Sequence, residues 1–113
     1  MIEAFYTDEF VLPLPAGHRF PMEKYRILRD KVHSSDCFIR LSVPSPATPG
    51  QLALAHCPHY IERIETGNVS RDEQRDIGFP WSEQMVERSR RSVGATVSAV
   101  RSALQHGASV NLA

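Results

Sequence analysis

Histidine and cysteine side chains are the first places to look for chemistry in this 113-residue sequence. The densest group is His56-Cys57-Pro58-His59, and only His33 and Cys37 are further plausible metal donors. Structural zinc sites take four nitrogen or sulfur ligands, usually from two closely spaced pairs. Because the other donors do not match that spacing, we interpret the group as the polar surface of a helix junction. Metal binding is the alternative.

A second candidate is His18, which stands in the segment GHRFP, directly after a glycine and ahead of an expected helix. Loops of this kind carry functional residues more often than cores do, although a surface or packing role suits the residue equally. The sequence holds no Gly-rich phosphate loop, no HExxH and no GxSxG segment. By spacing alone, we therefore predict no catalytic residue and no metal ligand set.

Arginines give the last long segment of the chain a basic appearance. Acidic residues lie among them, and Glu87 precedes Arg91 by four positions, which suits an ion pair across one helical turn. We therefore expect a solvated, partly paired face rather than a phosphate-binding surface. The arginines of this face are Arg88, Arg90, Arg91 and Arg101.

Composition limits the possible partners. Thirteen Lys and Arg residues balance thirteen Asp and Glu residues, so the charge gives no reason to expect a nucleic-acid or anionic-membrane partner. No apolar run approaches the roughly 20 residues that a membrane helix needs. The opening residues MIEAFYTDEF are acidic where a signal peptide carries a basic region. We predict a cytoplasmic protein with reduced cysteines and with no nucleic-acid or membrane partner.

Local signals predict helices mixed with a few short strands. Strands are expected near Phe5, over residues 37–43 and at ASVNL after Gly107. Prolines and capping residues mark the starts of the expected helices, with capping-box spacing at Thr48-Gln51 and Ser70-Glu73. These helices run from about Pro21 to Val32, from Thr48 to about Ala55, from Pro58 to Gly67, from Ser70 to before Gly78, and from Ser82 to Gly107.

The longest expected helix has two distinct faces. One carries an apolar stripe, and a neighbouring face of small residues is almost flat, so another backbone can pack closely against it. This helix leads through a single glycine into an apolar strand, which is typical of an αβ half-unit of a parallel sheet. The stripe consists of Val86, Val93, Val97, Val100 and Leu104, and the flat face of Gly94, Ala95, Ala99 and Ala103.

Three segments together resemble a known family. LPLPAGHRFPMEKYRILRDKV, LALAHCPHYIERIETG and IGFPWSEQMVERSRRSVGATVSAVRSALQHGASVNLA are similar, in that order, to the opening segment of zinc-dependent histone deacetylase family proteins, closest to bacterial members similar to class IV. The resemblance implies an α/β fold, the N-terminal part of a three-layer α/β/α arginase/deacetylase domain. Residues 1–113 would then be an incomplete part of one domain.

The resemblance also implies an activity. Family members hydrolyse acetyl-lysine or a similar acylated amine with zinc-activated water. In the family, the histidine pair and the zinc ligands follow the strand that corresponds to the segment ending in NLA. The chain by itself is therefore expected to bind no zinc, to hold no catalytic residue and to be inactive.

Some residues of the sequence match positions near the family's active-site mouth. His18 to Tyr25, including Phe20, matches the loop that lines the mouth. Arg26 matches a position where relatives place an arginine in a channel for the acetate product, although a plain helix-surface role is the alternative. Several class I relatives have a substrate-binding aspartate just before their long helix, whereas this sequence has Pro80 and Trp81 in that region. The substrate could therefore be a small acylated amine.

A different class of function competes with the deacetylase interpretation. The chain could be a non-catalytic helical module that binds a partner or associates with itself. An open strand edge near Val110 and the flat helix face would favour a homodimer, because unpaired strands and apolar patches tend to become covered.

Overall fold

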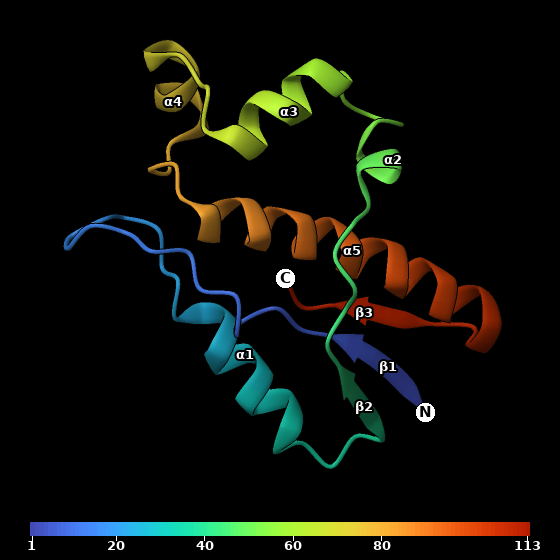
Figure 1. Ribbon diagram of the computed structural model, residues 1–113. Coiled ribbons are helices and arrows are strands. Elements are labelled where there is room, and N and C mark those ends of the chain that lie inside the picture. Colours follow the sequence, from blue (N-terminus) through green and yellow to red (C-terminus); the bar gives the residue numbers. More distant parts are fainter.

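All of residues 1–113 are described in a computed structural model, which contains one three-stranded sheet and five helices (Figure 1). The α/β class and the parallel sheet agree with the sequence prediction. The strands are β1 (Ile2–Phe5), β2 (Ile39–Ser42) and β3 (Ser109–Asn111). The helices are α1 (Lys24–His33), α2 (Pro49–Leu52), α3 (Pro58–Thr66), α4 (Arg71–Ile77) and α5 (Glu83–His106).

The sheet has the order β2-β1-β3, and both pairings are parallel. Ala4 of β1 lies opposite Leu41 of β2 on one side and Val110 of β3 on the other. Ala4 and Phe5 are buried because β1 is the central strand and α5 packs on β1 and β3. The outer edges of β2 and β3 have no strand partner within the chain.

Glu3 links three elements at the sheet. Its carboxylate accepts hydrogen bonds from Ser42 of β2 and Ser102 of α5, and it pairs with Arg40 of β2 at 3.0 Å. Burial by itself raises the pKa of Glu3, but the hydrogen bonds from these three side chains outweigh it and hold the pKa below its ordinary value. The side chain therefore stays ionised and connects the central strand to β2 and to α5.

Helix termini follow the predicted caps closely. Both capping boxes are present, at Thr48 with Gln51 and at Ser70 with Glu73. The hydroxyl of Ser82 accepts from the backbone N–H of Met85 and starts α5. Two predicted helices are longer than the observed ones. Regular helix begins at Lys24 rather than near Pro21, and α2 ends at Leu52 rather than near Ala55.

The helices between β2 and α5 form a separate layer joined by side-chain contacts. Arg63 of α3 makes a bidentate ion pair with Glu73 of α4, in which Nη1 and Nη2 donate to the two carboxylate oxygens, each at 2.6 Å. These hydrogen bonds, together with one from the Ser70 backbone, lower the pKa of Glu73 from an ordinary 4.5 to about 2. The Trp81 indole N–H donates to the Ile64 carbonyl, which fixes the start of α5 against the end of α3.

The face of α5 that packs on the sheet is not its apolar stripe. Its buried residues include Arg88, Ala95 and Ser102, which are spaced seven apart on one face. Within the stripe, Val100 is 54% exposed and Leu104 is 83% exposed. Small residues face the sheet because they let the helix backbone approach the strands closely, and this leaves the larger aliphatic side chains outside.

The prediction of a solvated arginine face on α5 is wrong for three of the four arginines. Arg88 is only 8% exposed, and Arg90 and Arg91 donate to the backbone carbonyls of Ala47 and Pro44. These arginines satisfy carbonyl groups of irregular segments that lack strand or helix partners, as buried backbone requires. Arg101 is exposed as expected, and the predicted pair between Glu87 and Arg91 is confirmed at 2.9 Å.

The prediction that another backbone packs on the flat face of α5 is confirmed at Gly94. A Cβ added there would lie 1.9 Å from the Ser45 carbonyl oxygen and 2.9 Å from the Ala47 nitrogen. The covering backbone is the chain's own proline-rich segment 44–47, which crosses α5 in Figure 1. This part of the flat face is therefore already occupied without a second copy of the chain.

None of the five helices combines the length and the hydrophobicity that a membrane-spanning helix needs.

We predict that Gly94→Ala destabilises the chain by about 3 kcal/mol, the upper end of the usual cost of overpacking, because the added methyl group overlaps backbone atoms that cannot rotate away. The matched control is Gly50→Ala, since the added Cβ there meets only the Thr48 hydroxyl, at 3.9 Å. We expect this control to be neutral or to stabilise by up to about 1 kcal/mol. Urea unfolding of both variants measures the difference, and equal stabilities would contradict the close packing at Gly94.

Candidate functional site

Three of the four predicted site residues gather around Phe79, a residue that the sequence interpretation did not select. The Phe20 and Phe79 rings meet edge to face with centroids 5.0 Å apart, and the His18 ring lies 5.8 Å from Phe79. Tyr25, in the first turn of α1, lies 6.2 Å from Phe20. We call these four residues, His18, Phe20, Tyr25 and Phe79, the aromatic wall. It joins the loop before α1 to the loop before α5.

Two hydrogen bonds fix the orientation of the His18 ring. Its Nδ1 accepts from the backbone N–H of Phe20 at 3.1 Å, so Nδ1 carries no proton. The proton of the neutral ring must then lie on Nε2, which donates to the Gly78 carbonyl at 3.2 Å. His18 therefore holds the two loops of the aromatic wall together through one defined tautomer. Protonation of the ring would remove the acceptor for Phe20.

Arg88 lies beneath the aromatic wall and is the functional candidate that sequence reasoning missed. Its guanidinium carbon is 4.4 Å from the centre of the Tyr25 ring, within the range of a cation–π contact. Its Nη1 donates to the Thr7 carbonyl, the Thr7 hydroxyl and the Phe10 carbonyl. The spacing of Arg88 by multiples of seven from Ala95 and Ser102 could have marked it as facing inward.

A cavity of about 410 Å³ lies against the aromatic wall. Phe20, Tyr25 and Phe79 form part of its lining. The remainder comes from Leu12 and from residues of α5, which are Met85, Arg88, Ser89 and Ser92. The lining is mainly apolar and aromatic with one charged group, as in many small-molecule sites.

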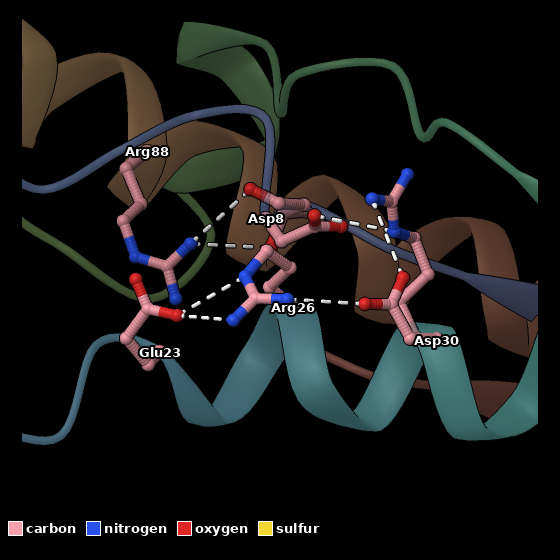
Figure 2. A network of polar contacts seen from close by, with 7 residues as sticks. Asp8, Glu23, Arg26, Asp30 and Arg88 are labelled. Carbon is pink, nitrogen blue, oxygen red and sulfur yellow. Dashed lines mark hydrogen bonds and ion pairs between the residues drawn. The ribbon is translucent and has the colours of Figure 1, made fainter.

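Arg26 does not join the other predicted residues. Figure 2 shows its guanidinium between the carboxylates of Glu23 and Asp30, which lie on the same helix or just before it. Its Nη2 lies 2.6 Å from Glu23, and the hydrogen bond to Glu23 is the main reason that the pKa of Arg26 is raised. The side chain is 53% exposed and does not line the cavity beside the aromatic wall. In this structure the helix-surface alternative describes its position.

The histidine and cysteine cluster forms no metal centre, because no three His, Cys, Asp or Glu side chains are placed to hold an ion. The His56 ring packs near Tyr60, and Cys57 caps the N-terminus of α3. Backbone N–H groups of Tyr60 and then His59, in the first turn of α3, lower the pKa of the Cys57 thiol, although the side chain makes no capping hydrogen bond. Both Cys37 and Cys57 are exposed free thiols.

Comparison with known proteins places the chain in a family. A family model described as the histone deacetylase domain matches residues 18–113, which begin at the first residue of the aromatic wall and include β2, β3 and all five helices. The chain belongs to this family. It is also 36% identical, over 110 residues, to an uncharacterized protein of Picosynechococcus sp.. That stretch is 96% of this chain and 37% of the relative, so the chain spans little more than a third of that protein's length.

Histone deacetylases are generally zinc-dependent, but residues 1–113 do not supply a zinc site. A catalytic zinc ion takes three protein ligands, and the described side chains assemble no such group. The described residues form a parallel sheet, the long helix α5 and the aromatic wall with its cavity.

We predict that His18 populates the Nε2–H tautomer in solution. The reason is the acceptor role of Nδ1 toward the Phe20 N–H, which only the unprotonated nitrogen can fill. Long-range ¹⁵N–¹H NMR of histidine-labelled protein above neutral pH distinguishes the two nitrogens, with exposed His106 as an internal comparison. A dominant Nδ1–H form at His18 would contradict the described connection between the two loops.

Proposed function

We propose that residues 1–113 form part of a single histone-deacetylase-like domain that removes acetyl or other acyl groups from acetyl-lysine or a small acylated amine. The observation that carries the proposal is the histone deacetylase domain match over residues 18–113. The catalytic histidines and the metal ligands of such a domain would come from residues outside this chain. By itself the chain is therefore proposed to be inactive and metal-free. A cytoplasmic location, and a place among bacterial members similar to class IV, belong to the same proposal.

The aromatic wall supports a role at the mouth of the active site. His18, Phe20 and Tyr25 fall in the segment that resembles the family's mouth loop, and their contacts with Phe79 give that segment a rigid, mainly apolar surface. Such a surface suits the aliphatic part of an acylated side chain and excludes water from it. The exposed position of Arg26, paired with two carboxylates, gives less support to a channel role for that residue.

The absence of an acidic residue before α5 supports a small substrate. Pro80 and Trp81 lie in that connection. The Trp81 indole N–H donates to the Ile64 carbonyl, and its backbone N–H donates to the Gln74 side chain. A carboxylate that could accept hydrogen bonds from a peptide backbone is therefore missing at this point. An acetylated polyamine fits such a site better than a histone tail.

We expect hydrolysis when this chain replaces the matched 110 residues of the Picosynechococcus protein, and no hydrolysis by the 113-residue chain alone. The reason is that the chimera would join this scaffold to the catalytic residues that it lacks. The assay follows release of acetate from an acetyl-lysine peptide and from an acetylated polyamine, each with and without a metal chelator. The unmodified Picosynechococcus protein is the control.

Two results would contradict the proposal. One is a folded chimera that is inactive while the unmodified relative hydrolyses either substrate. The other is metal-dependent hydrolysis by the 113-residue chain, which would require a catalytic site that the described residues do not form.

A second candidate function is self-association, favoured by the open edge of β3 and the exposed stripe on α5. β3 pairs only with β1, and Val110 at the strand centre is 42% exposed. The flat face contributes less than the sequence suggested, because segment 44–47 already covers Gly94. This proposal treats the chain as a binding module that needs no catalytic residues.

If the stripe mediates self-association, Leu104→Asp should convert a homodimer into a monomer, because it places a charge on the most exposed aliphatic residue of α5. Light scattering over a wide concentration range measures the mass. Leu54→Asp is the matched control, since Leu54 is 89% exposed but lies outside α5. A wild-type chain that stays monomeric at all concentrations would exclude this function.

A further inference from the structure

The loop between β1 and α1 has few polar connections to the rest of the chain. Residues 11–22 lie outside the helices and strands, and the bond from the His18 ring to the Gly78 carbonyl is their only hydrogen bond to a distant segment. Their other hydrogen bonds stay within the loop or reach the adjoining Lys24. Segments with few such connections open at a low cost in free energy. The position of this loop therefore depends on the His18 ring and on side-chain packing.

The two nitrogens of the His18 ring respond differently to a proton. Nε2 donates to the Gly78 carbonyl in the neutral ring and still donates in the imidazolium. Nδ1 accepts from the Phe20 N–H only while it is unprotonated, and a proton there would place two donors against each other. Phe20 would then lose the acceptor of its N–H. His18 would keep its bond to Gly78 and its ring contact with Phe79 at 5.8 Å.

The charged groups near His18 give an imidazolium no compensation. Arg75 lines the same surface cavity as His18, and no carboxylate lines that cavity. Asp72, beside it on α4, is already paired with Arg75 at 2.7 Å, and the connection 78–81 carries no titratable side chain. A protonated His18 ring therefore has no opposite charge to hold it as in the structure. The other cations in or against the aromatic wall and its loop are Arg19 of the loop, Lys24 of α1 and Arg88 of α5.

We propose that His18 is a pH-sensitive latch of the aromatic wall, which holds Phe20 against Phe79 when neutral and releases Phe20 when protonated. The closed wall binds one proton fewer at His18 than the released wall, so a fall in pH shifts the equilibrium toward release. Histidine side chains change charge between about pH 5 and pH 8, and the latch operates in that range. Phe20 lines the cavity of about 410 Å³, so its release would widen access to this cavity. Control of an active-site mouth by this latch rests on the proposed function.

The test uses the 113-residue chain and needs no enzymatic activity, so its failure is separate from failure of the proposed deacylase function. Nuclear Overhauser effects (NOEs) between aromatic rings are measured at about pH 8 and about pH 5, while the His18 ring ¹⁵N shifts follow its protonation. We expect the Phe20–Phe79 NOEs, which report rings 5.0 Å apart, to be lost at the lower pH. The His18–Phe79 NOEs should persist, because His18 stays at Gly78.

Three results would overturn the proposal. In the first, the Phe20–Phe79 NOEs persist after His18 has become protonated. In the second, His18 stays neutral at the lower pH. In the third, both sets of NOEs disappear together, which indicates general unfolding rather than a local release. General unfolding is not expected at this pH, because the pKa of Glu73 is lowered to about 2 and its ion pair with Arg63 stays intact.

A variant separates His18 from the other histidines. His18→Asn places an amide oxygen where it can accept from the N–H two residues ahead, as in an Asx turn, and this group does not titrate. We expect the Phe20–Phe79 NOEs of this variant to be independent of pH. His106→Asn, at the exposed end of α5, is the matched control and should keep the wild-type response to pH. A wild-type response in His18→Asn would contradict the latch, and the wild-type measurement decides if this variant fails to fold.

Discussion

Backbone carbonyl groups in two irregular segments depend on arginines of α5, and this dependence organises the rest of the structure. Thr7 and Phe10 accept from Arg88, and Pro44 and Ala47 accept from Arg91 and Arg90. These segments have no regular partner for their carbonyls, and unsatisfied buried groups are expensive. One helix therefore fixes the loop that follows β1 and the segment that follows β2. The close contact at Gly94 allows the second segment to lie near enough for those bonds to form.

The same arrangement places the aromatic wall. The segment after β1 leads into the loop that carries His18 and Phe20, and Arg88 also contacts Tyr25 at the start of α1. On the other side, the Trp81 hydrogen bond to α3 anchors the connection that carries Phe79. The wall is thus built from two loops held at both ends by regular structure. Loops positioned by a rigid scaffold are where binding surfaces are usually found.

Large apolar surfaces stay open on this part of the fold. Both edge strands lack an outer partner, and the aliphatic stripe of α5 faces away from the sheet. Parallel sheets are normally covered on both faces and continue through several strands. The described residues correspond to little more than a third of the Picosynechococcus relative. Under the proposed function, further polypeptide of the same domain would cover these surfaces; under self-association, another copy would.

Local structure was largely determined by the sequence alone. The capping boxes at Thr48 and Ser70, the start of α5 at Ser82 and the final strand all rest on interactions within a few residues, so their patterns were sufficient. The family could also be identified from its segments, because they span most of the chain. The sequence indicated close packing on the flat face of α5, but only the tertiary structure decided that the apolar stripe does not lie on the sheet. An apolar stripe predicts burial only when no other face of the helix carries smaller side chains that allow closer backbone contact. In α5 the small residues Ala95 and Ser102 face the sheet instead. It also decided that Arg88 is buried beneath Tyr25 while Arg26 is exposed, because both depend on contacts between segments far apart in the sequence.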